Sequence, residues 1–266
     1  MSGVCSFSFG GSAVLTNHFF AANGNASSST SATDVGNAFV LPIAMRIVAF
    51  SWHKANENPG FVTLTSVSVN PLQLYVDSSF GSKAISSEWL RVAANSVIRL
   101  QATNTNGNTA FRSCLITIYF TLEGNDWIGR SLNVVPFAGN IALKSPYVLK
   151  FGVDARTLLD TNMNYIGTMF TVPTPMRLFR VGYQKAGPDL VQDPTLQFYK
   201  NGQRVVNGSC TLGGVRGVVN FPLPDDSPAR QLSEGDVLQL RYEPHARELS
   251  TPGICIVTLY TTEEGV

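Results

Sequence analysis

The chain has 266 residues, 44% of them hydrophobic and only 14% charged, which is enough apolar material for one large or two medium domains. Its 19 Lys and Arg nearly balance 18 Asp and Glu, and the formal net charge of +1 excludes a strong electrostatic footprint for nucleic acid or anionic lipid. Because there is no apolar run of about 20 residues and no secretory leader, we expect a soluble protein made in a cytosol, without nucleic-acid or membrane partners.

In chain order, blocks of sequence from the first half recur in the second half without changing their order. The matches are Phe9, Gly11 and Leu15 with Phe137, Gly139 and Leu143; Phe39, Pro42, Met45 and Arg46 with Phe170, Pro173, Met176 and Arg177; Leu72–Tyr75 with Leu196–Tyr199; Val97–Leu100 with Val237–Leu240; and Cys114–Gly124 with Cys255–Gly265. Collinear matches predict two copies of one module, residues 1–126 and 134–266, joined by a linker at 127–133.

The spacing of the blocks predicts where the copies differ. The offset between matched residues is 131 in the second block, 124 in the third and 140 in the fourth, which makes the second copy seven residues shorter and then sixteen residues longer. Insertions go to surface loops, so we expect the copies to diverge there in what they contact.

Most blocks alternate apolar and polar residues with period two, which predicts half-buried strands. Cys114, Ile116 and Ile118 face one side of such a strand, and Asn201-Gly202 predicts a type I′ hairpin turn. The segment 86–94 is the only predicted short helix. We therefore predict an all-β protein of two tandem antiparallel β-sandwich, jelly-roll-like domains, with a plain immunoglobulin-like sandwich as the alternative.

The cysteines are four and widely spaced, with no CxxC pair and no zinc-finger histidines. We expect Cys5, Cys114, Cys210 and Cys255 to be reduced thiols, mostly buried as small hydrophobic side chains. No metal or other cofactor is predicted, and the three full disulfide pairings stay open as alternatives.

The sequence offers few candidate catalytic residues. His18, His53 and His245 occupy non-equivalent positions in the two copies, and no nucleophile or nucleotide motif occurs in the required context. The pair Asp225-Asp226 is the best candidate for the two carboxylates of a glycosidase, whereas Glu123 and Glu264 share a repeat position that is typical of solvated strand ends. We predict that the chain is not an enzyme and has no catalytic residues.

Aromatic residues divide into shared and unshared positions. Trp52 and Tyr183 share a repeat position and are predicted to fill the core. Trp89 and Trp127 have no counterpart in the other copy and are the candidate contact residues.

The phrase FVLPIAMRIVAFSW, repeated as FTVPTPMRLFRVGY and followed by LQ(L/F)Y and two closing strands, resembles the β-sandwich heads of virion surface and fibre proteins of double-stranded DNA viruses and phages. It is also similar to the tumour-necrosis-factor-like heads of collagen-like surface proteins. The resemblance implies a minor capsid, cement, vertex or fibre role, usually in a trimer. The chain lacks a collagen-like or coiled-coil stalk, which favours a capsid-shell component over a fibre.

These observations lead to three hypotheses. The first is a non-enzymatic structural protein of a virus particle, made in the host cytoplasm, whose partners are other capsid proteins and copies of itself. The second is a carbohydrate- or receptor-binding head, located in the virion or at a cell surface, with Trp89 as its motivation. The third is a glycosidase that uses Asp225 and Asp226.

Overall fold

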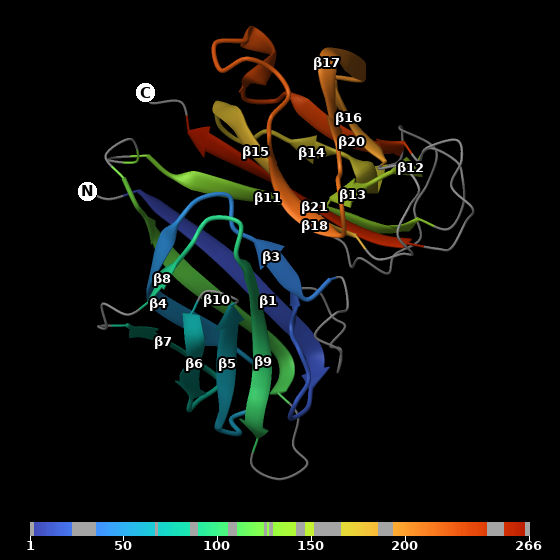
Figure 1. The fold of residues 1–266 in the computed structure, drawn as a ribbon. Coiled ribbons are helices and arrows are strands. Elements are labelled where there is room, and N and C mark those ends of the chain that lie inside the picture. The colour runs from blue at the N-terminus through green and yellow to red at the C-terminus, as the bar shows by residue number, and fades with distance from the viewer. Residues whose placement is uncertain are drawn as a thin grey trace. The chain divides into compact units, whose positions relative to one another are not determined.

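The structure is a computed structural model that describes residues 3–22, 36–66, 69–85, 90–105, 111–124, 127, 130–141, 147–151, 166–185, 194–243 and 253–263. The chain divides into two compact units, unit 1 (Met1–Ser131) and unit 2 (Leu132–Val266), with the division inside the segment 127–133 that the sequence marks as a linker. The described elements are strands apart from short 3-10 turns, including Ile166–Thr168 and Pro228–Arg230 (Figure 1). Among these described residues, no helix is long and apolar enough to cross a membrane.

Unit 1 contains two antiparallel sheets. The first has the order β2 (Ala21–Ala22), β1 (Val4–Val14), β10 (Phe111–Leu122), β4 (Met45–His53), β7 (Phe80–Ala84), with β8 (Arg91–Val92) also paired to β4. The second has the order β3 (Ala38–Val40), β9 (Val97–Thr105), β5 (Gly60–Ser66), β6 (Val69–Val76). The chain crosses repeatedly between the sheets, and its first and last long strands pair with each other, which is the jelly-roll arrangement.

Unit 2 has the same strand order. Its first sheet runs β13 (Lys150–Phe151), β11 (Leu132–Ile141), β21 (Gly253–Glu263), β15 (Met176–Lys185), β18 (Arg216–Asn220), with β19 (Gln231–Leu232) also on β15. Its second runs β12 (Tyr147–Val148), β20 (Val237–Glu243), β16 (Thr195–Lys200), β17 (Gln203–Thr211), with β14 (Phe170–Thr171) also on β20. The predicted all-β class with tandem sandwich domains is confirmed, whereas descent from one duplicated module stays an interpretation.

Each unit buries the inward side chains of its two sheets. In unit 1, the rings of Phe7 and Phe9 pack edge-on against Phe39, with centroids 4.9 Å and 5.2 Å apart. In unit 2, Phe198 packs against Phe221 at 4.5 Å. The predicted alternation in the closing strand is confirmed, because Cys114, Ile116 and Ile118 are buried while Leu115 and Tyr119 are exposed.

Two local predictions of shape have opposite outcomes. Asn201 and Gly202 have positive φ values of 52° and 75° in the turn between β16 and β17, which confirms the type I′ hairpin. The short helix over 86–94 is wrong in its described part, since Arg91–Val92 forms strand β8 against β4. Residues 86–89 lie outside the described residues. Pairing with Arg46 and Met45 satisfies the backbone of this segment more fully than one isolated helical turn.

The match of Leu72–Tyr75 with Leu196–Tyr199 is wrong as a structural equivalence. The first segment lies on β6, an edge strand, and the second lies on β16, which has a neighbour on both sides as β5 does. A Leu-Gln-aromatic alternation fits either strand of a hairpin, because both present every second side chain to the core. With β16 matched to β5, the seven-residue loss and sixteen-residue gain disappear, and unit 2 has only small extensions in several connections.

Candidate functional site

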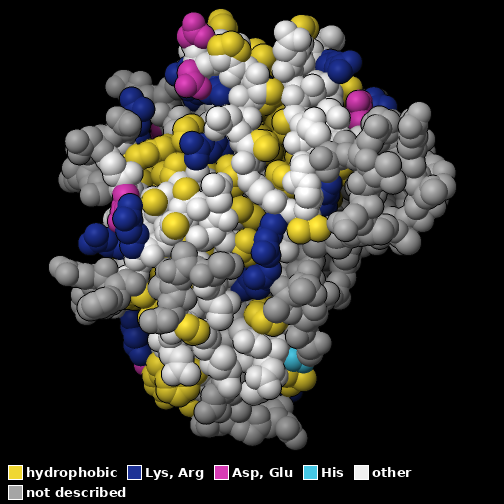
Figure 2. Space-filling model, in the orientation of Figure 1, with side chains coloured by type: hydrophobic (Ala, Val, Ile, Leu, Met, Phe, Trp, Pro, Cys, Tyr) yellow, Lys and Arg dark blue, Asp and Glu magenta, His cyan; other side chains and the backbone are white. Residues whose placement is uncertain are grey.

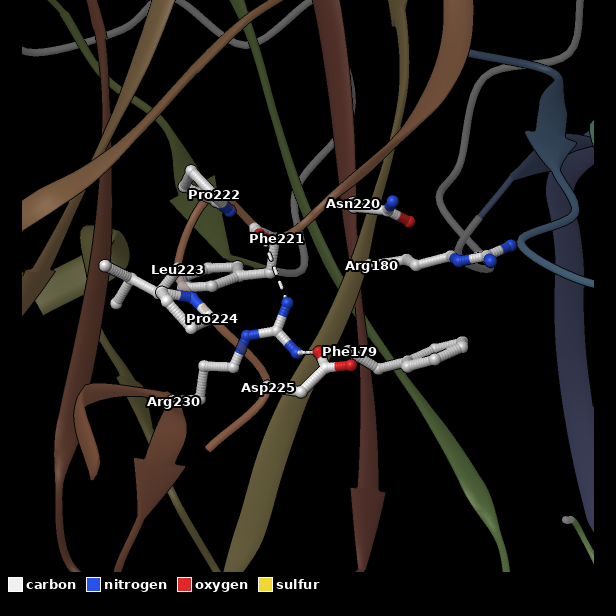
Figure 3. A pocket seen from close by; sticks show the side chains of 9 residues that line it. All are labelled: Phe179, Arg180, Asn220, Phe221, Pro222, Leu223, Pro224, Asp225 and Arg230. Atoms are coloured by element: carbon white, nitrogen blue, oxygen red, sulfur yellow. Dashed lines mark hydrogen bonds and ion pairs between the residues drawn. The ribbon is translucent and has the colours of Figure 1, made fainter. Parts of the chain in front are cut away.

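A hollow of about 520 Å³ opens in unit 2 beside strands β15 and β18 (Figure 3). Its walls come from β15, from the end of β18 and from the connection that leads to β19. The lining residues are Phe179, Arg180, Asn220, Phe221, Pro222, Leu223, Pro224, Asp225 and Arg230. The volume lies within the range of roughly 300–1,000 Å³ that is typical of small-molecule sites.

A β-bulge places the two β15 residues of this hollow. The pairing of β15 with β21 shifts register between Leu178 and Arg180. Such a shift lets consecutive side chains leave the strand on the same side, and Phe179 and Arg180 project in the same direction in Figure 3. The Arg180 guanidinium carbon lies 5.0 Å from the Phe179 ring centroid, a cation–π distance.

The connection between β18 and β19 forms the opposite wall. Its prolines prevent regular strand pairing, and the Ser227 hydroxyl accepts from the Ala229 amide at 3.4 Å to begin the 3-10 turn Pro228–Arg230. The equivalent connection in unit 1, between β7 and β8, is shorter. The hollow therefore belongs to a place where the two units differ, as expected for a loop on a shared scaffold.

Arg230 is the unusual residue of this wall. It immediately precedes β19, as Leu90 precedes β8, and both side chains are buried, with 5% and 4% of their surface exposed. Its Nη2 donates to the Phe221 carbonyl at 2.9 Å, its Nη1 donates to Asp225, and its guanidinium lies 5.7 Å from the Phe221 ring. Its buried Nε has no hydrogen-bond partner among the described residues. A buried arginine thus replaces a core leucine of the scaffold.

The ion pair in the hollow is asymmetric. The Arg230 side chain is 6% exposed, whereas that of Asp225 is 92% exposed. The two arginines outnumber the one carboxylate, so the lining carries a net positive charge. Sequence reasoning missed Arg230, although the spacing that aligns Val97 with Val237 also aligns Leu90 with Arg230.

A second feature is the outer surface of the first sheet of unit 1. Three rows of residues run across β1, β10, β4 and β7: Gly10, Leu115, His53 and Phe80; Ser8, Thr117, Ser51 and Ser82; Ser6, Tyr119, Ala49 and Ala84. We call these residues the uncharged face, because they include no Lys, Arg, Asp or Glu. All except Gly10 are at least partly exposed, and Phe80 is 72% exposed.

Hydroxyl groups on the uncharged face are paired with one another. The Ser8 and Thr117 hydroxyls lie 3.0 Å apart, and the Ser51 hydroxyl lies 3.1 Å from that of Tyr119. These internal bonds lower the polarity that the face presents to water. On the side of the molecule drawn in Figure 2, charged side chains are dispersed singly or in small groups among uncharged ones.

An aromatic cluster flanks one end of the same unit. The Lys83 ammonium lies 5.1 Å from the Tyr75 ring and 5.5 Å from the Trp52 ring, and it bonds Asp77 at 2.8 Å. This bond lowers the pKa of the Asp77 carboxyl. Trp52 itself is buried and donates to the Ser78 carbonyl at 3.1 Å, and Tyr183 is buried at the matching place in unit 2. The prediction that both fill the core is confirmed.

The candidate contact residues from the sequence are only partly described. Trp127 is partly exposed in a short turn, where its amide donates to the Gly124 carbonyl at 3.2 Å. Trp89 lies outside the described residues. No finding tests either as a binding residue.

The candidate catalytic groups are not brought together. Asp225 and Asp226 are both exposed in the β18–β19 connection, and Asp225 is engaged with Arg230. His18 lies in the connection between β1 and β2, and His53 is the last residue of β4, while His245 and Glu264 are outside the described residues. Within the described ranges, no group of three or more His, Cys, Asp or Glu is placed to hold a metal ion.

The four cysteines are free and buried, as predicted. Burial raises the pKa of each thiol from 9.0 to about 12. A thiol with so high a pKa is a poor nucleophile at neutral pH. These side chains therefore act as core residues.

A buried lysine lies near one of these thiols. Lys54 donates to the carbonyls of Asn56 and Asn58 at 2.6 Å and 2.8 Å, and burial lowers its pKa. Both acceptors belong to the connection between β4 and β5, so Lys54 fixes that connection to the core.

No protein-family model and no curated protein sequence matches the chain. Among solved structures, PNGF-II matches 99% of this chain with 8% identity and a TM-score of 0.32, and the match spans 65% of PNGF-II, slightly less than two thirds of its length. A protein described by its triple jelly-roll fold and turret assembly in an archaeal virus matches 98% of this chain and 79% of its own, with 11% identity and a TM-score of 0.22. A chain of infectious bursal disease virus, Gx strain, matches 100% of this chain and 68% of its own, with 8% identity and a TM-score of 0.27. These TM-scores are too low to carry an argument about function.

Proposed function

We propose that the protein is a non-enzymatic structural component of a virus particle, which contacts its neighbours through exposed sheet faces. The observation that carries the proposal is the uncharged face of unit 1, set on one of two tandem jelly rolls. Viral capsid proteins use the jelly roll, as do lectins and cupins. The assignment to a virion is therefore supported by analogy of fold, and the contact surface is supported by the residues of the uncharged face.

The uncharged face has the chemistry of a surface that can be buried at low cost. Burying an ion without a partner costs several kcal/mol. These rows contain no Lys, Arg, Asp or Glu, and His53, which can be protonated, lies in an outer row. Leu115 and Phe80 supply apolar area, Tyr119 supplies an aromatic ring with a polar end, and paired hydroxyls fill the centre. Interface cores are likewise poor in Lys, Glu and Asp and rich in aromatic residues such as Phe80 and Tyr119, although they contain less Ser and Ala than this face does.

The partners in this proposal are other capsid proteins and further copies of the chain, in a homo-oligomer for which the resemblance favours a trimer. The protein would reside in the virion after synthesis in the host cytoplasm. No cofactor takes part in this role.

A charge placed at the centre of the uncharged face tests this proposal. Thr117→Lys puts an ammonium in the middle row, and Thr211→Lys, on an exposed position of β17, is the matched control. Self-association by light scattering and co-sedimentation with purified particles of the encoding virus are measured. We expect Thr117→Lys to weaken association by roughly 30-fold or more, because a buried unpaired charge costs about 2–5 kcal/mol. The proposal is overturned if the wild-type chain is strictly monomeric and does not co-sediment with particles, or if the Thr117→Lys variant associates normally.

The second candidate function is a carbohydrate- or receptor-binding head. The hollow around Arg230 favours it, since its walls combine apolar side chains with hydrogen-bonding groups in a volume suited to a small ligand. A glycan array probed with the full chain tests this candidate, and an array without hits removes it.

A further inference from the structure

We infer that the hollow in unit 2 is a binding site for a sugar that carries a carboxylate, with Arg230 as the group that recognises the acid. This inference goes beyond the structural role and does not depend on the virion assignment. It develops the second candidate function by naming a ligand class and the residues that select it.

The residue at position 230 is charged, whereas its counterpart in unit 1 is apolar. The jelly-roll scaffold does not require a charge at this position, because unit 1 places Leu90 there and buries it equally well. Arginine is rarely buried unless it is paired, and its desolvation costs several kcal/mol. A guanidinium in the wall of a hollow is suited to recognising a carboxylate, because its planar set of N–H groups matches the two carboxylate oxygens.

The protein itself accepts hydrogen bonds from only some of the Arg230 donors. A guanidinium has five N–H groups, and Asp225 and the Phe221 carbonyl each accept one of them here. Because Phe221 O fixes Nη2 from within the protein, the guanidinium is held in place before a ligand arrives. Preorganisation of this kind reduces the entropy that binding must overcome.

Asp225 is the exposed partner in this pair. Its side chain is almost fully exposed on a surface connection, although its partner is buried. Water can solvate this carboxylate when it leaves, and a ligand carboxylate then supplies the partner that the buried guanidinium requires. A ligand carboxylate can therefore replace Asp225 at Nη1 and form the same charge-assisted hydrogen bond. In this exchange Asp225 is a competitor that occupies the site when no ligand is bound.

The other lining residues suit the ring of a sugar. Phe179 contributes a ring, Pro222 and Pro224 add apolar surface, and Asn220 adds an amide, whereas the Phe221 ring is buried against Phe198 and supports the wall from behind (Figure 3). A pyranose has an apolar C–H face that packs on such surface and hydroxyls that bond an amide. The net positive lining favours an acidic sugar over a neutral one, and about 520 Å³ accommodates one or two sugar rings.

Isothermal titration calorimetry with the full chain tests the inference. The probes are glucuronic acid, galacturonic acid and sialic acid, free and as short oligosaccharides, with glucose and galactose as neutral counterparts and a short acidic peptide as a competing class. We expect binding of at least one acidic sugar and no binding of the neutral sugars. Absence of binding by every acidic sugar, equal binding of neutral sugars, or binding of the peptide alone overturns the inference.

Three variants separate recognition from a merely structural clamp. Arg230→Leu copies Leu90 of unit 1, so we expect it to fold normally and to bind the acidic sugar at least tenfold more weakly; Arg204→Leu, at an exposed position of β17, is the control. Asp225→Asn removes the competing carboxylate and is expected to tighten binding severalfold. If the Arg230–Asp225 pair only holds the β18–β19 connection in place, this variant gives no gain in affinity. Unchanged affinity in Arg230→Leu, or weaker binding in Asp225→Asn, contradicts the assignment.

The same variants keep this inference distinct from the virion proposal. Arg230 belongs to unit 2, whereas the uncharged face belongs to the first sheet of unit 1. Arg230→Leu is therefore expected to associate with particles as the wild type does, and Thr117→Lys is expected to bind the acidic sugar normally. Failure of one assay leaves the result of the other interpretable.

Discussion

A methyl group added at Gly81 tests how unit 1 is packed. Gly81 on β7 lies opposite Trp52 on β4, and a Cβ there would approach Cζ2 of the indole to 2.3 Å and two other ring carbons to 2.8 Å and 2.9 Å. The ring is held, because it is buried, donates to the Ser78 carbonyl and stacks on Phe50 with centroids 5.3 Å apart. Overpacking of this kind costs about 1–3 kcal/mol, and three contacts below 3 Å place Gly81→Ala near 3 kcal/mol.

Urea denaturation followed by tryptophan fluorescence measures this cost. All three tryptophans of the chain lie in unit 1, so the signal reports that unit even when the two units unfold separately. Ser82→Ala, at an exposed neighbour on the same strand, is the control and is expected to change stability by less than about 0.5 kcal/mol. Trp52→Leu combined with Gly81→Ala should cost less than the sum of the single changes. A Gly81→Ala variant as stable as the wild type would refute the reasoning.

Three further predictions concern the turn, the thiols and the surface charges. Gly202→Ala, at φ +75° with no atom within 4 Å of the added Cβ, is expected to lose about 1 kcal/mol in circular-dichroism melts of unit 2, and Gly202→Asn less; equal losses contradict the turn. At pH 8 a thiol reagent should label no cysteine of the native chain and four after denaturation, and labelling of the native chain argues against burial. The pKa of each thiol is about 12 in the folded chain and 9.0 in the unfolded chain. The free energy of unfolding should therefore fall as pH rises between these values, by about 1.4 kcal/mol per pH unit for each thiol. Glu123→Gln, which removes the pairs that this partly buried carboxylate makes with the exposed Arg46 and Arg91, should cost less than about 1 kcal/mol and less still at high salt, a larger loss being the contrary result.

The fold class could be predicted because its signals are local. Alternation along Cys114–Phe120 specifies which side chains are buried, and Asn201-Gly202 specifies a turn by its backbone requirement alone. The helix predicted over 86–94 was wrong because local helix-favouring residues do not reveal that a distant strand is available for pairing. Its described part pairs with β4, a contact that depends on residues more than forty positions earlier in the chain.

The sites could not be predicted to the same degree, because they depend on which strands become neighbours. The uncharged face takes three residues from each of β1, β10, β4 and β7, and no single segment shows that Ser8, Thr117, Ser51 and Ser82 lie side by side. The sequence did contain one usable signal for Arg230, because this arginine aligns with Leu90, an apolar residue, at the offset of the neighbouring block. The carbonyl and ring that hold it come from the connection around Phe221, whose path the sequence does not specify.

Electron cryo-microscopy of purified particles of the virus that encodes the chain tests the central claim most directly. The account predicts density for both jelly rolls in the particle, with the uncharged face of unit 1 against a neighbouring subunit and Thr117 near the centre of that contact. Particles that lack the chain, or that contain it with this face open to solvent, would contradict the account.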